Sequence, residues 1–191
     1  MNPDLITKIK ERLPLLEDKT SNTFGNTPRL AAVMIPMYFI DNELHLPFIV
    51  RPDYGGVHGG QISFAGGKTE ETDPTPIYTA IRETQEEIGV EVSHEQVIGV
   101  MPKLYVVPSN MLVTPVVAYL NARPTFTIDP NEVDRVLEVK ITDLQNPANH
   151  SKRSVVMPNN IKMQFPSFLV QGVEIWGATA RMLSEFFKLI A

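Results

Sequence analysis

Residues 82–89 read RETQEEIG, so three glutamates fall within five positions and a glycine follows them. Apolar residues around this stretch recur at helical spacing, which predicts a helix over residues 77–88. Gly89 is expected to end the helix, because glycine readily adopts the left-handed conformation found at helix C-termini. Asp73 is expected to cap its start, with Pro74 at the first helical position. The helix thus gathers three like charges near its C-terminal end, an arrangement that needs a physical reason.

The predicted helix has two different sides. A rotation of about 100° per residue places Glu83, Glu86 and Glu87 together, opposite the side expected to face the core. Like charges at this spacing cost a few tenths of a kcal/mol each, and anions near a helix C-terminus oppose the helix dipole. A magnesium or manganese ion removes both penalties, because it prefers oxygen ligands. A solvated acidic face is the alternative. The residues expected to face the core are Ile77, Ala80, Ile81, Thr84 and Ile88.

The loop before the helix favours the metal interpretation. Gly66 and Gly67 follow a short predicted strand, Gln61 to Phe64, and bare glycine backbone allows a ligand to approach closely. The glycine carbonyls could add oxygen ligands that face the helix. Arg82 lies four residues before Glu86 and is expected to brace it. A strand, a glycine pair, an acidic loop and this helix together are more specific than any one of them.

The stretch of residues 66–90, GGKTEETDPTPIYTAIRETQEEIGV, resembles the signature box of the Nudix hydrolases. That box runs Gly, five residues, Glu, seven residues, Arg-Glu, an apolar residue, any residue, Glu-Glu, any residue, Gly and an apolar residue. Counted from Gly67, the first half of the box is one residue longer here than in the general pattern. The position of the first box glutamate could therefore be taken by Glu70, Glu71 or Asp73. The matching positions are Arg82, Glu83, Glu86, Glu87, Gly89 and Val90, with Thr84 at the first apolar place.

The stretch before the box, FIVRPDYGGVHGGQISFAGG at residues 48–67, is similar to the coenzyme A pyrophosphatase group of that family. This chain departs from the group's upstream motif at Pro52, Gly56 and Ala65. Gly56 stands where the group has an arginine, which removes a cation that could meet a substrate phosphate. The substrate therefore stays open between coenzyme A or its acyl derivatives and ADP-ribose or another nucleotide conjugate.

The resemblance implies roles for the residues of the box. Glu83, Glu86 and Glu87 would hold divalent ions, Mg²⁺ or Mn²⁺, and the carbonyl of Gly66 would add a ligand. Glu83 could instead orient or deprotonate the attacking water, and Arg82 would brace the carboxylates. A non-catalytic module that senses a nucleotide is the alternative. Such a module would be expected to lose box carboxylates, and this chain keeps all three.

Further residues are candidates outside the helix. Arg51, His58 and Lys68 are expected to contact the substrate, which is a small nucleotide-derived molecule. Glu132 and Glu138 could each supply a remote metal ligand or base, although a surface position is the simpler interpretation. The large aromatic residues near the C-terminus, Trp176 included, are expected in the core.

The order of predicted elements indicates an α/β (α+β) fold, a Nudix-like α/β/α sandwich with a mixed sheet between helices. Residues 1–191 are expected to form a single Nudix hydrolase domain, in which 1–28 are an N-terminal helix and loop extension. The other predicted helices cover residues 4–16 and 177–190. The predicted strands are 30–40, 44–50, 61–64, 97–101, 104–107, 112–120 and 133–139, with further strands or a hairpin within 153–176, and the predicted loops are 17–28, 51–60 and 65–76.

The composition excludes several classes of function. The formal net charge of −5 disfavours general binding to nucleic acid or to a membrane. The chain has no cysteine, so disulfides and thiolate nucleophiles are excluded. The charged N-terminus lacks the apolar core of a signal peptide, and the longest apolar stretch, residues 30–40, is too short to span a bilayer. A cytoplasmic location is the default expectation, and a homodimer is possible.

Overall fold

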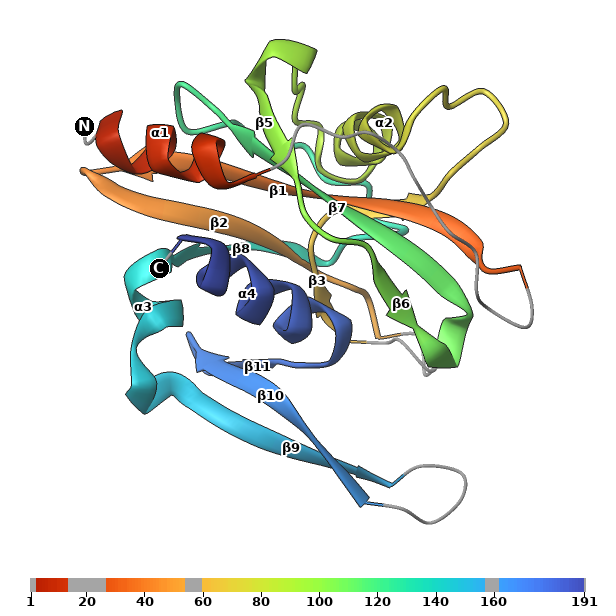
Figure 1. Cartoon of the computed structure of the whole chain (residues 1–191), viewed down its shortest axis with the longest axis vertical. Coiled ribbons are helices and arrows are strands. Elements are labelled where there is room, and N and C mark those ends of the chain that lie inside the picture. Colours follow the sequence, from red (N-terminus) through yellow and green to blue (C-terminus); the bar gives the residue numbers. More distant parts are fainter. Residues whose placement is uncertain (1–2, 14–26, 54–59, 157–161, 191) are drawn as a thin grey trace.

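The computed structural model describes residues 3–13, 27–53, 60–156 and 162–190 (Figure 1). Within these ranges a sheet of eight strands forms the centre of the molecule, with the order β3-β2-β1-β7-β5; β4 also pairs with β1, β6 with β7, and β8 with β2. β1 and β7 run parallel, while the other pairs are antiparallel. The strands are β1 (Arg29–Ile40), β2 (Glu43–Val50), β3 (Ile62–Ser63), β4 (Gly66–Lys68), β5 (Val97–Val100), β6 (Leu104–Val106), β7 (Met111–Tyr119) and β8 (Arg135–Lys140).

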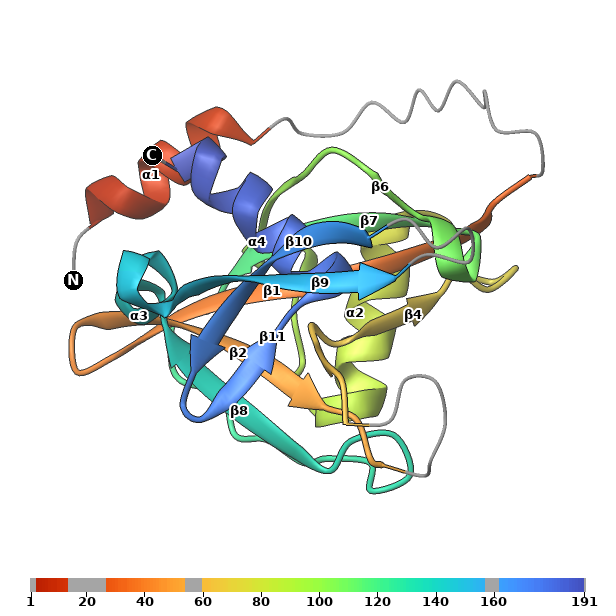
Figure 2. The same ribbon diagram turned by 90° about the horizontal axis from the view of Figure 1, so that it is seen from below.

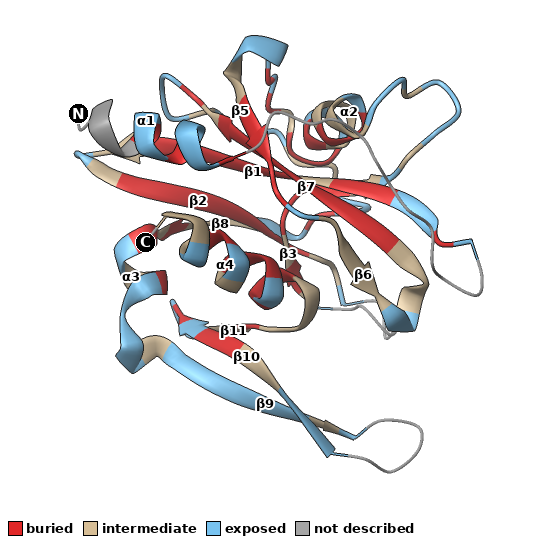
Figure 3. Cartoon of the chain, viewed as in Figure 1, coloured by how far each residue is buried: buried red, intermediate tan, exposed pale blue. Residues whose placement is uncertain are grey.

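Helices cover both faces of this mixed sheet (Figure 2). α2 (Pro76–Ile88) packs on one face and buries Ala80 and Ile88 in one core cluster. The helices α1 (Pro3–Arg12), α3 (Ile141–Gln145) and α4 (Gly177–Ile190) bury apolar side chains in a second cluster on the other face. The predicted sandwich of a mixed sheet between helices is therefore confirmed. Buried residues concentrate on β1, β2 and β7 (Figure 3).

A second, three-stranded sheet projects from the domain and has the order β11-β10-β9. It consists of β9 (His150–Val156), β10 (Lys162–Val170) and β11 (Val173–Ile175). Its base packs beneath α4, where Phe168 contacts Phe187 with ring centroids 6.1 Å apart. β9 is exposed along most of its length (Figure 3), and we call β9 and β10 the β9–β10 arm. The strands predicted within residues 153–176 are confirmed, although the first begins earlier, at His150.

The N-terminal helix joins the main core. Ile6, Ile9 and Leu13 are buried there. Gly99 on β5 lets α1 lie close, because a Cβ atom at that position would collide with the Leu13 side chain. The helix predicted over residues 4–16 is observed from Pro3 to Arg12, and its last predicted residues lie outside the described ranges.

Three details of the prediction were wrong. Residues 66–68 were expected in a loop but form β4, which pairs with the β1 residues Ala31, Ala32 and Val33. The expected N-cap, Asp73, is replaced by Thr75, whose side chain accepts from the Tyr78 backbone N–H at 3.4 Å. Pro76, not Pro74, therefore occupies the first turn. The short helix α3 was not predicted. No helix in the described part of the chain is both long and apolar enough to cross a membrane.

Candidate active site

The C-terminal end of α2 is fixed by a neighbouring segment of backbone. Gly89 has φ 67°, and its N–H donates to the Gln85 carbonyl. The carbonyls of Glu87 and Ile88 accept from the backbone N–H groups of Asp129 and Thr127, at 3.0 and 2.9 Å. Carbonyls that a helix end normally leaves unpaired are thus satisfied. A Cβ atom at Gly89 would lie 2.7 Å from the Thr127 Cβ, so this close approach requires glycine.

Arg82 is the centre of an ionic network. Its Nε and Nη2 donate to the two carboxylate oxygens of Asp73 at 3.1 and 2.9 Å. Its Nη1 donates to Glu83 Oε1 at 3.0 Å and to Glu86 Oε2 at 2.9 Å. Nη2 also donates to the Lys68 carbonyl at 3.0 Å, which ties α2 to β4. Arg82 therefore braces two box carboxylates rather than Glu86 alone. Its bidentate ion pair with Asp73 fixes the plane of the guanidinium group.

Asp73 thus has a different function from the predicted helix cap. Its carboxylate is 6% exposed, and it accepts from Arg82, from the Thr79 hydroxyl and from the Glu70 backbone N–H. The hydrogen bonds from Arg82 lower the pKa of Asp73 from its ordinary value of 3.8 to about 2, against the opposing effect of burial. Of the three early box positions that stayed open, Asp73 is the one that holds Arg82 most closely; Glu70 lies 3.9 Å away.

This lowered pKa predicts a pH dependence of stability. A carboxyl group whose folded-state pKa is depressed stabilises the fold fully above its unfolded pKa and loses that contribution as the pH falls toward the folded value. Between about pH 5 and pH 3, the wild type is expected to lose roughly 1 kcal/mol more unfolding free energy than Asp73→Asn. Urea unfolding at several pH values measures this difference. Asp134→Asn, in an exposed ion pair with Arg135, is the control and should track the wild type.

Glu87 is the buried member of the acidic face. Its side chain is 2% exposed. Oε2 accepts from the Gly66 backbone N–H at 2.8 Å, and Oε1 accepts from Arg51 Nη2 at 3.2 Å. Burial raises the pKa of Glu87 to about 7, although the hydrogen bond from Gly66 and the charge of Arg51 oppose this shift. The expectation that all three glutamates point away from the core was therefore wrong for Glu87, because β4 and Arg51 cover this side of the helix.

Glu83 lies against the second glycine. Its side chain is 14% exposed, and a Cβ atom at Gly67 would lie 2.5 Å from Glu83 Cδ. Only a glycine leaves room for the carboxylate here. Burial raises the pKa of Glu83, while the hydrogen bond from Arg82 opposes the shift. Glu86 differs from both, since its side chain is 59% exposed and reaches back to Arg82 from the next turn.

Glu132 comes close to the same carboxylates. Its charge raises the pKa of both Glu83 and Glu87, after the larger effect of burial in each case. The turn that positions it begins at Asp129, whose N–H is bound to the Glu87 carbonyl, and ends at Val133, which is fully buried. Of the two acidic residues weighed outside the box, Glu132 therefore belongs beside the site. The Asp-Pro-Asn turn that precedes it was the available sequence signal.

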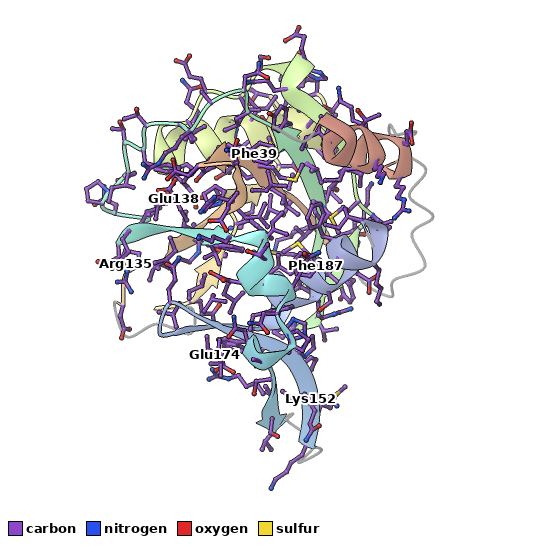
Figure 4. All side chains as sticks on the ribbon, turned by 90° about the vertical axis from the view of Figure 1, so that its left-hand side faces the viewer. Phe39, Arg135, Glu138, Lys152, Glu174 and Phe187 are labelled. Atoms are coloured by element: carbon purple, nitrogen blue, oxygen red, sulfur yellow. The ribbon has the colours of Figure 1, made fainter. Side chains whose placement is uncertain are left out.

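Glu138 lies elsewhere (Figure 4). Its carboxylate accepts from the Tyr38 hydroxyl at 2.8 Å and from two nitrogens of Arg123, at 3.0 and 2.5 Å. Burial alone would raise the pKa of Glu138, but these hydrogen bonds lower it. This group joins β1 and β8 to the segment after β7.

The three residues expected to contact a substrate differ in how they are placed relative to the box carboxylates. Arg51 lies at the end of β2 and bonds Glu87, with its side chain 34% exposed. Lys68 is exposed on β4, and its carbonyl is engaged by Arg82. His58 lies outside the described residues. A cavity of about 390 Å³ lies apart from all of them, and it is lined by Lys10, Ser93, Glu95, Gln96, Ile98, Tyr119 and Asn121.

The donor set suits a divalent ion. In the described ranges, no group of three His, Asp or Glu side chains converges as a metal cage. Arg82 and the Gly66 N–H bond the box carboxylates. The oxygens of Glu83, Glu86 and Glu87 are nevertheless hard ligands on adjacent turns of one helix. The room that Gly67 leaves beside Glu83 admits that carboxylate. The residues present therefore fit a divalent cation.

Comparisons with known proteins show the family of this chain. Residues 28–159 match the family model of the NUDIX domain. Mitochondrial coenzyme A diphosphatase NUDT8 of Mus musculus is 32% identical over 195 residues, which cover 100% of this chain and 92% of that protein. Uncharacterized Nudix hydrolase NudL of Pectobacterium atrosepticum is 31% identical over 182 residues, covering 95% of this chain and 91% of that protein.

Solved structures show the same fold. The MutT/nudix family protein from Enterococcus faecalis superposes with a TM-score of 0.60 at 13% identity, over 100% of this chain and 70% of that chain. The MutT protein from Methanosarcina mazei Go1 superposes with a TM-score of 0.55 at 13% identity, over 87% of this chain and 96% of that chain. The chain belongs to the Nudix family, and it is a hydrolase of the pyrophosphatase class.

Proposed function

We propose that this protein hydrolyses the diphosphate bond of coenzyme A or an acyl-coenzyme A, giving 3′,5′-ADP and 4′-phosphopantetheine or its acyl form. The observation that carries the reaction type is the set of box carboxylates on α2 beside the Gly66–Gly67 backbone. The substrate assignment is supported by the relative from Mus musculus, which is named a coenzyme A diphosphatase and covers the whole chain.

The residues have separate tasks in this proposal. Glu83, Glu86 and Glu87 are the ligands for Mg²⁺ or Mn²⁺, with the Gly66 carbonyl as an additional oxygen. Arg82 holds Glu83 and Glu86 in place before the substrate arrives. Glu87 is positioned by the Gly66 N–H, so backbone geometry sets its orientation. When bound, the divalent ions neutralise the charge of the diphosphate and make hydroxide available near neutral pH.

Two residues face the substrate side. Arg51 donates to Glu87, and we propose that its guanidinium also contacts a phosphate oxygen of the substrate. Lys68, exposed on β4, meets the same phosphate group as a second cation. Their positive charge offsets the repulsion between the substrate and the acidic face.

A substrate panel tests the proposal. Coenzyme A, an acyl-coenzyme A, ADP-ribose and a dinucleoside polyphosphate are incubated with Mg²⁺ or Mn²⁺, and the products are identified by mass. We expect 3′,5′-ADP and 4′-phosphopantetheine from coenzyme A. Cleavage of ADP-ribose without cleavage of coenzyme A would refute the substrate assignment and favour the second candidate, ADP-ribose or another nucleotide conjugate.

The single domain over residues 1–191, the cytoplasmic location and the possible homodimer stay predictions. The Mus musculus relative is named as a mitochondrial protein. Size-exclusion chromatography with light scattering measures the oligomeric state directly.

A further inference from the structure

The base of the β9–β10 arm carries a cation stacked on a tryptophan. Arg153 Cζ lies 4.2 Å from the centroid of the Trp176 ring. Its Nη1 donates to Glu174 Oε2 at 2.7 Å, and the Arg153 side chain is 42% exposed. Within the described ranges, this is the one hydrogen bond of the guanidinium group. Glu174 therefore orients the guanidinium and leaves its other donors available. Figure 4 shows Glu174 and Lys152 on opposite sides of the arm.

A buried hydroxyl without a partner lies beneath this pair. Ser167 is 1% exposed, and its Oγ makes no hydrogen bond to any described residue. Ser167 pairs with Ser151 on β9, and the β10–β11 register of Phe168 with Ile175 places Trp176 opposite Ser167 one step further. Arg153 is two residues along β9 on the same face. The Arg153–Trp176 contact thus adjoins the end of this pairing, and a buried hydroxyl such as that of Ser167 is costly unless another group bonds it.

Space adjoins this cluster. α4 begins at Gly177, directly after Trp176, and a Cβ atom built on Gly177 meets nothing within 4 Å. The N-terminus of a helix this long favours an anion, because its first N–H groups point outward and its dipole is positive. Charge, an aromatic face, a free hydroxyl and open space therefore meet at one place. Each of these features suits a phosphorylated nucleoside.

Continuous contacts connect this cluster to the catalytic side. The Thr179 hydroxyl on α4 donates to the Ile62 carbonyl on β3 at 3.0 Å, and β11 lies beside β3. The next residue, Gln61, accepts from the Arg51 backbone N–H through its carbonyl at 2.9 Å. Arg51 in turn bonds Glu87. These contacts connect the Arg153–Trp176 pair, through the edge strand β3, to Arg51 and Glu87.

We propose that Arg153, Trp176 and Ser167 form the subsite for the 3′-phosphoadenosine end of the substrate, an inference that rests on the proposed hydrolysis of coenzyme A. In the bound state the adenine ring takes the place of the guanidinium on the indole face. Arg153 then pairs with the 3′-phosphate, and the Ser167 hydroxyl donates to the same phosphate. Arg153 supplies from the arm a cation that the sequence lacks at Gly56.

The chain's single tryptophan, Trp176, makes this directly testable by fluorescence. Protein in EDTA, which removes metal-dependent binding, is titrated with 3′,5′-ADP and, separately, with 5′-AMP. We expect 3′,5′-ADP to change the emission saturably and to bind at least about tenfold more tightly than 5′-AMP, since it adds a charge-assisted contact. Arg153→Gln is expected to weaken 3′,5′-ADP binding by about tenfold and 5′-AMP binding little.

The matched control is Lys152→Gln, the adjacent residue on the opposite face of the strand, which should change the Kd less than about twofold. Equal affinity for the two nucleotides, or no saturable change with 3′,5′-ADP, overturns the subsite. Equal weakening of both nucleotides by Arg153→Gln, together with a lowered thermal midpoint, shows that the arginine only braces the arm and overturns it as well.

A hydrolysis assay separates the two proposals. With Mg²⁺, Arg153→Gln is expected to lower kcat/KM for coenzyme A about tenfold through KM, and to leave 3′-dephospho-coenzyme A nearly unaffected. If the wild type cleaves neither compound, the proposed function is wrong, and the fluorescence titration still decides the subsite. If it cleaves both and Arg153→Gln changes them equally, the proposed function survives and the subsite does not.

Discussion

Replacing Glu86 by glutamine is expected to lower kcat/KM for diphosphate hydrolysis by about a hundredfold or more, the scale found when a charge-stabilising group is removed from an active site. The substitution keeps size and shape but removes a hard anionic ligand. Stability should change little, because the Glu86 side chain is 59% exposed and its bond to Arg82 Nη1 is shared with Glu83. Steady-state kinetics with Mg²⁺ and thermal unfolding of the same sample measure both effects.

Glu91→Gln is the matched control, since Glu91 is an exposed glutamate just beyond the helix. It should retain wild-type kinetics and the same thermal midpoint. If Glu86→Gln still hydrolysed the substrate at the wild-type rate, the acidic face of α2 would not be the metal site. A parallel loss in both variants would instead indicate a general effect of surface charge.

The two adjacent glycines are expected to respond oppositely to alanine. Gly66 has φ 152°, and its Cβ atom would lie 2.5 Å from the Val33 Cα in the paired strand. The backbone of the paired strand cannot move aside as a flexible side chain can. Gly66→Ala is therefore expected to lower the unfolding free energy by about 3 kcal/mol or more. At Gly67 the obstructed atoms are the carboxylate of Glu83, which is the end of a flexible side chain. Gly67→Ala should therefore displace Glu83 and remove activity with little loss of stability.

Urea unfolding and kinetics on both variants test this contrast, and each glycine is the control for the other. Equal destabilisation by the two substitutions would show that Gly67 serves the β1–β4 pairing rather than Glu83. Wild-type activity in Gly67→Ala would show that the position of the Glu83 carboxylate is not required for hydrolysis.

The helix could be predicted because its signals are local. The 3.6-residue periodicity of residues 77–88 and the left-handed Gly89 are both properties of neighbouring residues, and both are present in the structure. The start of the helix was harder. Asp73 and Thr75 are each good caps, and the choice depends on Arg82, which engages Asp73 from nine residues further along the chain. N-cap propensity is a property of neighbouring residues, so it does not take that ion pair into account.

The burial of Glu87 could not be predicted for a related reason. Helical periodicity places residues on a face but does not say what covers that face. Here β4 covers that face. Glycine has low strand propensity, so the sequence of Gly66–Lys68 indicates a loop, and only its pairing with β1 makes it a strand. Glu132 reaches the site because the backbone of Thr127 and Asp129 docks on the end of α2. The Asp-Pro-Asn sequence indicates a turn there, but backbone contacts leave no side-chain pattern that shows where the turn docks.

The parallel pairing of β1 with β7 bears on the order of folding. Residues 29–37 align with residues 111–119, so the centre of the sheet joins segments about eighty positions apart. During synthesis the acidic helix and its glycine partner leave the ribosome well before β7 does. Because long-range pairing is slow and its loop closure is unfavourable, we expect the site to become ordered late, after Tyr119 is available. A nascent chain halted before β7 should therefore bind no substrate, even though it already contains every box residue.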